Sequence, residues 1–439
     1  MSVSDERDRP HLVFLPSGIG NSALLFRLAA AMASRNCRVT FINVHPPQPA
    51  FPNQPGVEVL DFEMLAVADT ASLDDGDPFI ARAAAINRAF RQLNPILTSL
   101  QASAIFSDFA VAATLADLNI PLFIVSTTSA KFLALVANTP RLLSRDPDAF
   151  SNCAGEIQVQ LGMPSIPKAS IPAAWLHKSS SNNLLTAYLL PNARALSRVR
   201  GVVFNTFDWF EQETLAVAAL DSSRPPLFPV GPLPTHQQQG GHQYHLPWLR
   251  EQPAKSVVYV NFGSQLEVIS QDQIGEVRKG LEICGYGYLW AMAEGEPCFE
   301  RRGKGVIARG GVDQERVLAD PAIGVFVNQC EWQSIMQAAW EGVPVLAWPQ
   351  HGDQRMNAEA VEKTGLGMWM KEWSRGGEGA VDGDEIGRVV RQMMEDLNIN
   401  KAAEIVRERA REAASENGGS SQKAFHKLMH MFTSNNNYS

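Results

Sequence analysis

The sequence predicts an α/β protein made of two doubly wound, parallel-sheet domains of the Rossmann type. Near the amino terminus, a short apolar run is followed by a glycine-containing turn, a helix-period stretch and a second β-rich run. Strand, glycine turn, helix and strand in this order begin a doubly wound sheet. A second series of the same kind starts at Val257, and 439 residues with 45% hydrophobic content suit two domains.

The first strand is predicted over Leu12 to Pro16, and Ser17-Gly-Ile-Gly forms the turn that ends it. Apolar residues recur at helical spacing from Ser22 to Arg35, and Val39 to Val44 is the next strand. Another apolar run, Pro121 to Val125, predicts a strand whose carboxyl end carries polar residues.

The stretch from Pro225 to Pro247 is rich in Pro, Gln, Gly and His, which interrupts both helix and strand patterns. We therefore predict an amino-terminal domain over 1–235, a linker over 236–247, and a carboxy-terminal domain over 248–419. Residues 420–439 are expected to form a helix, Ser420 to Phe432, and a tail.

The charge pattern argues against nucleic acid as a partner. The formal net charge is −8 at pH 7, and no basic patch is evident that would neutralise phosphates. The five cysteines show no metal-ligand or disulfide-framework spacing, so we expect no metal site. They are Cys37, Cys153, Cys284, Cys298 and Cys330.

The amino terminus MSVSDERDRP is charged and precedes a strand, and no run of 18 apolar residues occurs. We therefore expect a cytoplasmic protein that does not insert into membranes, and a monomer.

Arg309 to Gln354 reads RGGVDQERVLADPAIGVFVNQCEWQSIMQAAWEGVPVLAWPQHGDQ and resembles the nucleotide-sugar motif of plant family 1 glycosyltransferases. Pro10 to Asn21, Phe106 to Phe109 and Tyr259 to Ser264 resemble other landmarks of that family, particularly of its flavonoid C-glucosyltransferases. The resemblance implies a GT-B-like fold with two domains facing a central cleft, and a carboxy-terminal helix that crosses back to the first domain. These positions match at the right spacing: Cys330, Trp332, Ser334, Gly342, Val343, Pro344, Trp348, Pro349, Asp353, Gln354 and Asn357.

Most polar donor positions of the resembled motif are nonetheless changed. The Trp that stacks on uracil in the family corresponds to Gly311, and an aromatic platform is worth ~1–3 kcal/mol per base. The His and Asn that hold the diphosphate correspond to Gln329 and Gln333, and the Glu that holds the ribose corresponds to Gln337. Ser334 is retained. We interpret these positions as a degenerate donor site.

The family's Gly at the start of the motif helix corresponds to Glu331. A helix amino terminus favours anions, so this carboxylate would occupy the diphosphate position with negative charge. Two like charges ~4 Å apart repel by roughly 4 kcal/mol at an effective dielectric of ~20. The alternative is that Glu331 only caps its helix.

The family's catalytic His corresponds to Asn21, and an amide cannot act as a base near neutral pH. Asp108 matches the Asp that partners this His, and it would serve as an acid or base if burial raised its pKa. Asn21 would stabilise an oxyanion, and His351 would replace the lost base. Structural roles are open for all three: Asp108 as a helix cap, Asn21 as an N-cap and His351 as a solvated side chain.

Six further residues are candidates for substrate binding. Asp353 and Gln354 match the family's pair for sugar hydroxyls. His45 follows the second predicted strand, and three polar residues follow the strand that ends at Val125: Ser126, Thr127 and Thr128.

Together these residues predict a glycosyltransferase-like protein that has lost the use of UDP-sugar and needs no cofactor. It would act on a phenolic or polyphenolic small molecule of plant specialised metabolism by cyclisation, dearomatising addition, isomerisation or elimination. One alternative is a C-glucosyltransferase that uses UDP-glucose on a flavonoid-type acceptor. The other is a non-catalytic protein that binds a small molecule.

Overall fold

The structure is a computed structural model that describes residues 9–18, 22–44, 54–62, 78–178, 184–233, 247–263, 269–292, 298–374 and 379–433. The chain divides into two compact units: residues 1–238 together with 413–439, and residues 239–412. Of the linker predicted over 236–247, all but the last residue lies outside the described residues, and Pro247 begins helix α9, Pro247–Arg250. The second division falls in the last turn of α15, Leu397–Ala414, rather than at residue 420.

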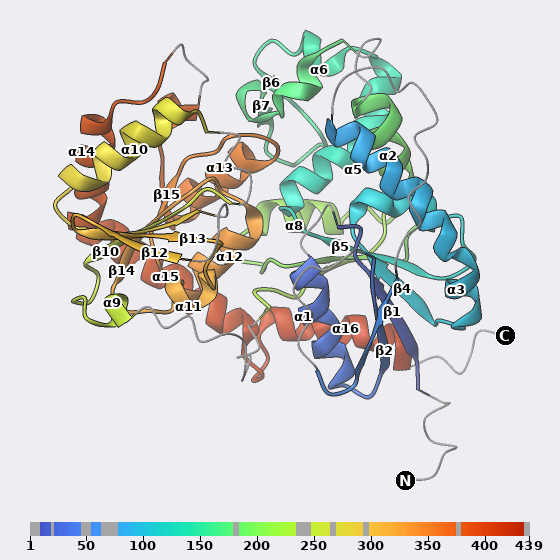
Figure 1. Cartoon of the computed structure of the whole chain (residues 1–439). Coiled ribbons are helices and arrows are strands. Elements are labelled where there is room, and N and C mark those ends of the chain that lie inside the picture. The colour runs from blue at the N-terminus through green and yellow to red at the C-terminus, as the bar shows by residue number, and fades with distance from the viewer. Residues whose placement is uncertain are drawn as a thin grey trace. The chain divides into compact units, whose positions relative to one another are not determined.

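Unit 1 contains a seven-stranded sheet in the order β3-β2-β1-β4-β5-β8-β9, and all its strand pairs are parallel (Figure 1). The central strand β1 is buried along its whole length, as expected for a parallel strand covered on both faces. The strands are β1 His11–Leu15, β2 Arg38–Asn43, β3 Val57–Asp61, β4 Ala104–Ser107, β5 Leu122–Ser126, β8 Gly201–Phe204 and β9 Leu227–Pro229. A separate antiparallel pair is formed by β6 Glu156–Ile157 and β7 Ile166–Pro167.

Helices α1 and α16 share one core with the sheet of unit 1. Phe14 and Phe106 stack at 4.7 Å between ring centroids, and Phe425 and Leu428 from α16 belong to the same cluster. The carboxy-terminal helix therefore packs in unit 1. The helices of this unit are α1 Ser22–Ala33, α2 Pro78–Phe90, α3 Asn94–Ser99, α4 Ala112–Leu115, α5 Ala130–Arg145, α6 Ala149–Asn152, α7 Leu190–Ala195, α8 Gln212–Ala219 and α16 Ser420–Thr433.

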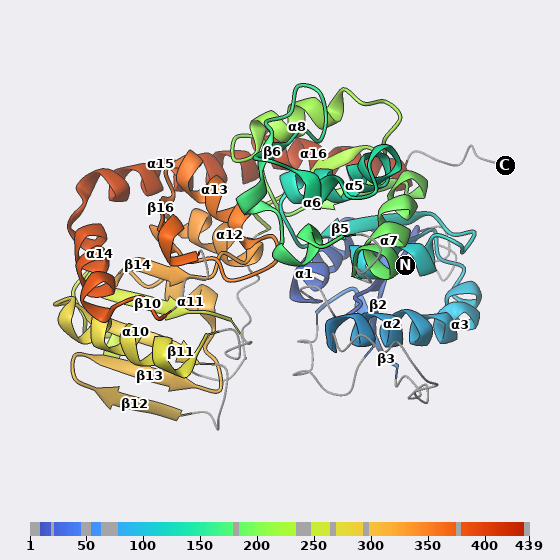
Figure 2. The same ribbon diagram turned by 90° about the horizontal axis from the view of Figure 1, so that it is seen from above.

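Unit 2 contains a second seven-stranded sheet, in the order β12-β13-β11-β10-β14-β15-β16. Its pairs are parallel except for β12 with β13, a hairpin at the sheet edge that Figure 2 shows clearly. The strands are β10 Val257–Asn261, β11 Gly287–Met292, β12 Cys298–Arg302, β13 Gly305–Arg309, β14 Ile323–Asn328, β15 Val345–Ala347 and β16 Gly367–Trp369.

Helices α10, Gln271–Ile283, and α14, Gly383–Glu395, cover one face of this sheet. Their apolar residues, among them Val277, Leu281 and Val390, pack with Trp290 and Val325 from the strands. Besides α9 and most of α15, the unit also contains α11 Gln314–Leu318, α12 Trp332–Glu341 and α13 Gln354–Thr364.

The prediction of two doubly wound, Rossmann-type sheets is confirmed. The predicted strands over Leu12 to Pro16 and Val39 to Val44 are observed one residue earlier, as β1 and β2, and the helix predicted from Ser22 ends at Ala33. In the described part of the chain, no helix is long and apolar enough to cross a membrane.

Candidate functional site

The motif turn of unit 2 joins β14 to α12 through Gln329, Cys330 and Glu331. Cys330 has a φ of 71°, a left-handed conformation that is uncommon outside glycine. Two amides hold it there, because the Cys330 N–H donates to Asn328 Oδ1 at 2.7 Å and Asn357 Nδ2 donates to the Cys330 carbonyl at 3.0 Å. Such backbone strain persists where the surroundings impose it, and it is common at functional sites.

Glu331 precedes the first residue of α12, but its side chain makes no capping hydrogen bond. Gln354 Nε2 donates to Glu331 Oε1 at 3.2 Å instead. Loss of solvation, and secondly the negative charge of Asp353, raise the pKa of Glu331 to about 6, although part of the side chain is still exposed. The helix-cap alternative for Glu331 therefore has no support in its hydrogen bonds.

His351 and Asp353 lie in the turn before α13, which begins at Gln354, and Asp353 and Gln354 are the two residues of this segment that interact with Glu331. Gln354 is buried, and its Oε1 accepts the N–H groups of Gln350 and His351 at 2.8 and 3.0 Å. Both ends of this amide are thus engaged within the protein. His351 is exposed, and partial desolvation lowers the pKa of its ring more than Asp353 raises it, so the imidazole is neutral at pH 7.

Gln314, the first residue of α11, is the centre of a hydrogen-bond network that the sequence analysis did not single out. Asn261 Nδ2 donates to Gln314 Oε1 at 2.8 Å. Gln314 Nε2 donates to Ser334 Oγ at 2.9 Å and to Gln337 Oε1 at 2.6 Å. The available signal was the retained Gln of the family's Gly-Trp-x-x-Gln.

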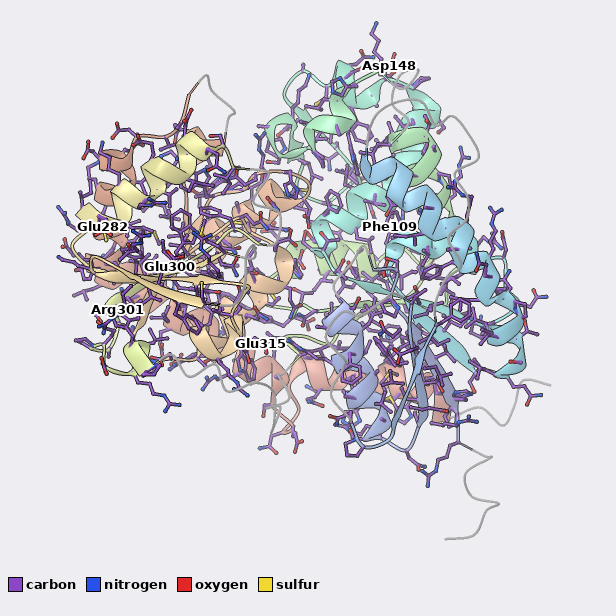
Figure 3. All side chains as sticks on the ribbon, viewed as in Figure 1. Phe109, Asp148, Glu282, Glu300, Arg301 and Glu315 are labelled. Atoms are coloured by element: carbon purple, nitrogen blue, oxygen red, sulfur yellow. The ribbon has the colours of Figure 1, made fainter. Side chains whose placement is uncertain are left out.

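Glu315 extends this network, because Gln337 Nε2 donates to Glu315 Oε1 at 2.6 Å (Figure 3 labels Glu315). The side chain at position 337 must therefore accept a hydrogen bond from Gln314 and donate one to Glu315. An amide supplies both and a carboxylate does not.

Restoring the family's Glu with Gln337→Glu is expected to destabilise the protein by about 1–3 kcal/mol, because a second carboxylate would face Glu315. Glu315→Gln in the same chain should recover most of this loss. Urea unfolding of the two single variants and the double variant measures the coupling. Additive effects would show that the contact between residues 337 and 315 does not select the amide.

Gly311 and Gln329, which are predicted to lie at the uracil and diphosphate positions, differ in how much room surrounds them. Gly311 has a φ of 86°, and no atom lies within 4 Å of where its Cβ would be. Gln329 is 4% exposed, and its Oε1 has no hydrogen-bond partner among the described residues. Its Nε2 packs 2.3 Å from the Cβ position of Gly263, so this contact requires glycine. Gln333 is half-buried in the first turn of α12.

In unit 1, Asp108 follows β4 and is 2% exposed. Its Oδ2 accepts the Ser17 N–H at 2.7 Å and its Oδ1 accepts the Ala110 N–H at 3.0 Å, which caps the short helix Phe109–Val111. Burial raises the pKa of Asp108 against these hydrogen bonds. Asp108 therefore makes the contacts expected of a helix cap, and it also has the raised pKa expected of a catalytic acid or base.

Tyr188, which the sequence analysis missed, lies close enough that Asp108 contributes, after burial, to raising the pKa of its phenol. No sequence signal marked it. Two predicted site residues, Asn21 and His45, lie outside the described residues.

Ser126, at the end of β5, is buried, and its Oγ donates to the Thr128 carbonyl at 3.0 Å. Its hydroxyl is thus used within its own turn, whereas Thr127 and Thr128 are half-buried. Glu211, which no sequence pattern marked, accepts the N–H groups of Ala130 and Lys131 at the start of α5, and burial raises its pKa to about 7.

Residues 231–379 match the family model described as UDP-glucoronosyl and UDP-glucosyl transferase. The chain is 37% identical to the UDP-glycosyltransferase CGT of Oryza sativa subsp. japonica, with 94% of each chain covered. It is 34% identical to UDP-glycosyltransferase 708G2 of Citrus unshiu, with 98% of each covered.

Solved structures agree with these relatives. The structure of LpCGTa in complex with UDP matches with a TM-score of 0.81 and 33% identity, covering 97% of this chain and 99% of that one. Medicago truncatula UGT71G1 complexed with UDP-glucose matches with a TM-score of 0.77 and 25% identity, covering 98% of this chain and 100% of that one. The fold is therefore GT-B, and the chain belongs to the UDP-glycosyltransferase family.

Proposed function

We propose that this family member no longer uses a UDP-sugar donor and acts without a cofactor on a phenolic or polyphenolic molecule in the acceptor region of unit 1. In this proposal the protein is cytoplasmic and monomeric, and its ancestor was a flavonoid C-glucosyltransferase. The observation that carries the proposal is the carboxylate of Glu331 at the amino terminus of α12, beside Asp353.

The charge of Glu331 opposes binding of a diphosphate. In the family that the chain resembles, the start of the helix that corresponds to α12 receives the diphosphate. At neutral pH, a pKa of about 6 leaves Glu331 mostly ionised. The repulsion of roughly 4 kcal/mol for a charge ~4 Å away is an upper value here, because Glu331 is partly exposed and water screens it. Asp353 adds negative charge on the same side.

Amide side chains at the predicted donor site are already hydrogen-bonded within the protein. Gln314 and Gln337 satisfy each other and Glu315, and the amide of Gln354 is bonded at both ends. A donor that used these side chains would first have to break protein hydrogen bonds, each worth about 0.5–1.5 kcal/mol net. Gly311 contributes no aromatic surface for uracil.

Calorimetric titration with uridine, UMP, UDP and UDP-glucose tests the proposal. We expect dissociation constants weaker than about 1 mM for UDP and UDP-glucose, and no gain in affinity from uridine to UDP, because each phosphate approaches Glu331. A micromolar constant for UDP-glucose would overturn the proposal.

The raised pKa of Glu331 predicts how residual binding depends on pH. Glu331 is neutral below a pH of about 6 and charged above it, whereas the diphosphate of UDP-glucose stays ionised. Binding should therefore strengthen as pH falls from about 7.5 to about 5.5. Glu331→Gln should bind more tightly at the higher pH and lose most of this dependence, and an equal dependence in both proteins would exclude Glu331 as its origin.

The catalytic part of the proposal depends on unit 1. Asp108 is a buried carboxylate of raised pKa near Tyr188. It lies at the carboxyl edge of the sheet, and doubly wound sheets bind ligands at this edge. A single positioned acid or base is sufficient for the cyclisation, addition, isomerisation or elimination of an acidic phenol. Incubation with flavonoid-like and polyketide-like phenols, without any sugar donor, should yield a product isomeric with or derived from the phenol alone.

The second candidate is a C-glucosyltransferase, favoured by the relatives named CGT and by the UDP complex of LpCGTa. A glucoside formed from UDP-glucose and a phenol would establish it. Tight binding of a phenol that is never converted would instead favour a binding protein.

A further inference from the structure

A recess of about 410 Å³ lies in unit 2 at the amino-terminal edge of the sheet. Gly285 and Gly287 border it where β11 begins, and Arg301 and Lys304 border it at the β12–β13 turn. The motif turn follows the carboxyl end of β14, which runs parallel to β11 through β10, so the recess lies at the opposite edge. Figure 3 shows Arg301 and Glu282 at the end of the unit away from Glu315.

Glycine residues, which leave space, and one aromatic ring shape the recess. Trp248, from α9, places Cζ2 3.5 Å from the Cβ position of Gly287, so the indole borders the space above this glycine. The Gln252 amide donates to the Trp248 carbonyl at 3.0 Å and forms part of the lining. The glycine at Gly305 is required for packing, because a Cβ there would lie 2.5 Å from the Tyr288 ring.

Two cationic side chains, Arg301 and Lys304, line the recess. Arg301 pairs with Val306 through its backbone, but its exposed side chain makes no ion pair or hydrogen bond within the described part of the chain. Lys304 Nζ uses one of its three donors on the Gly285 carbonyl, at 3.2 Å. The carboxylate of Glu282 lies against the lining residue Gly303, and it accepts the Tyr288 hydroxyl at 2.6 Å.

Glu300 does not neutralise Arg301. It accepts from Arg302 at 3.3 Å and from Arg309 at 3.0 Å. Successive residues of a strand point to opposite faces, so Glu300 and Arg302 share a face of β12 and Arg301 faces the other way.

We propose that this recess binds an aromatic carboxylate, with the ring against Trp248 and the carboxylate held by Arg301 and Lys304. The guanidinium matches a carboxylate with two parallel hydrogen bonds, and the ammonium adds a third donor. The volume is in the range of small-molecule sites, about 300–1,000 Å³. This site is separate from both the nucleotide motif and the acceptor region, so it holds whether or not the proposed function does.

The test is a ligand-observed NMR titration of the full chain with 4-hydroxybenzoate and, as a neutral molecule of the same shape, 4-hydroxybenzamide. We expect a dissociation constant near 1 mM for the carboxylate and at least fivefold weaker binding of the amide. Gly287→Val should abolish binding by filling the recess, since the backbone at Gly287 is not left-handed and a Cβ there makes only ordinary contacts.

The charge variant Arg301→Gln with Lys304→Gln should weaken carboxylate binding at least fivefold and keep the test valid if Gly287→Val does not fold. Arg388→Gln is the matched control, because Arg388 is an exposed cation on α14 of the same unit and does not line the recess. Binding that persists in both recess variants would place the carboxylate elsewhere, for example in the acceptor region, and would overturn the proposal. Equal affinity for benzoate and benzamide would also overturn it.

Discussion

Asp108→Asn is expected to lower the free energy of unfolding of unit 1 by about 1–3 kcal/mol and, if Asp108 is the catalytic acid or base, to reduce turnover by about 10²–10⁴. Both carboxylate oxygens accept buried backbone N–H groups, from Ser17 and Ala110. An asparagine has one carbonyl oxygen, so its amide NH₂ would face one of these donors and leave it unsatisfied. Removal of a buried charge offsets part of this loss.

The measurement separates the two effects. Urea unfolding gives the stability change, and turnover is measured per folded molecule at a temperature well below the transition. Asp117→Asn is the control, because Asp117 is an exposed carboxylate that pairs with Arg198 at 2.9 Å in the same unit, and its loss should cost less than about 1 kcal/mol. Lower stability with normal turnover would leave Asp108 a structural residue, and the catalytic proposal would fail.

The fold was predictable because its signals are local. Leu12 to Leu15 is a continuous apolar run, as a central parallel strand buried on both faces requires. The helix after it repeats apolar residues at helical spacing, and seven of its residues are buried. The antiparallel hairpin of β12 and β13 was not predicted, since short strands with charged, exposed residues such as Arg301 and Arg302 do not show the pattern of a buried strand.

The sequence indicated the positions of the candidate site, but it did not indicate their contacts. Matched spacing pointed to Glu331, Gln337 and Gln354, all of which lie in one unit at the carboxyl edge of one sheet. Their partners come from other elements: Gln354 reaches Glu331 across 23 residues of sequence, and Glu315 reaches Gln337 across 22. Pairings over such separations depend on how α11, α12 and α13 pack, which hydrophobic periodicity does not reveal.

These partners also change what the substitutions mean. Taken singly, Gln337 in place of a family Glu is a weaker ribose ligand, but next to Glu315 it is the residue type that the neighbour needs. Likewise, Glu331 places a carboxylate at the predicted diphosphate position, but it is also the acceptor for Gln354. We therefore expect that reverting a single one of these positions will not recover a donor site.

Reverting the donor positions is expected to give a definite order of effects on UDP affinity. Glu331→Gly should tighten UDP binding by tenfold or more at neutral pH, because it removes a charge at the start of α12, and glycine is nearly as good an N-cap as the usual polar residues. Gly311→Trp should gain less. The backbone at Gly311 is left-handed, at a φ of 86°, and holding a tryptophan there costs about 1–2 kcal/mol of the ~1–3 kcal/mol that stacking supplies.

Combining both changes with Gln329→His and Gln333→Asn should lower the dissociation constant of UDP by at least about 10²-fold, as measured by calorimetry with Arg388→Gln as the control. Glucoside formation should stay undetectable in Glu331→Gly alone and in the combined variant, because Asn21 provides no base. Adding Asn21→His to the combined variant is the step that should allow transfer. A larger gain in UDP affinity from Gly311→Trp than from Glu331→Gly would show that stacking rather than charge limits donor binding. Glucoside formation by Glu331→Gly alone would show that a single carboxylate, rather than several changed positions, separates this chain from its transferase relatives.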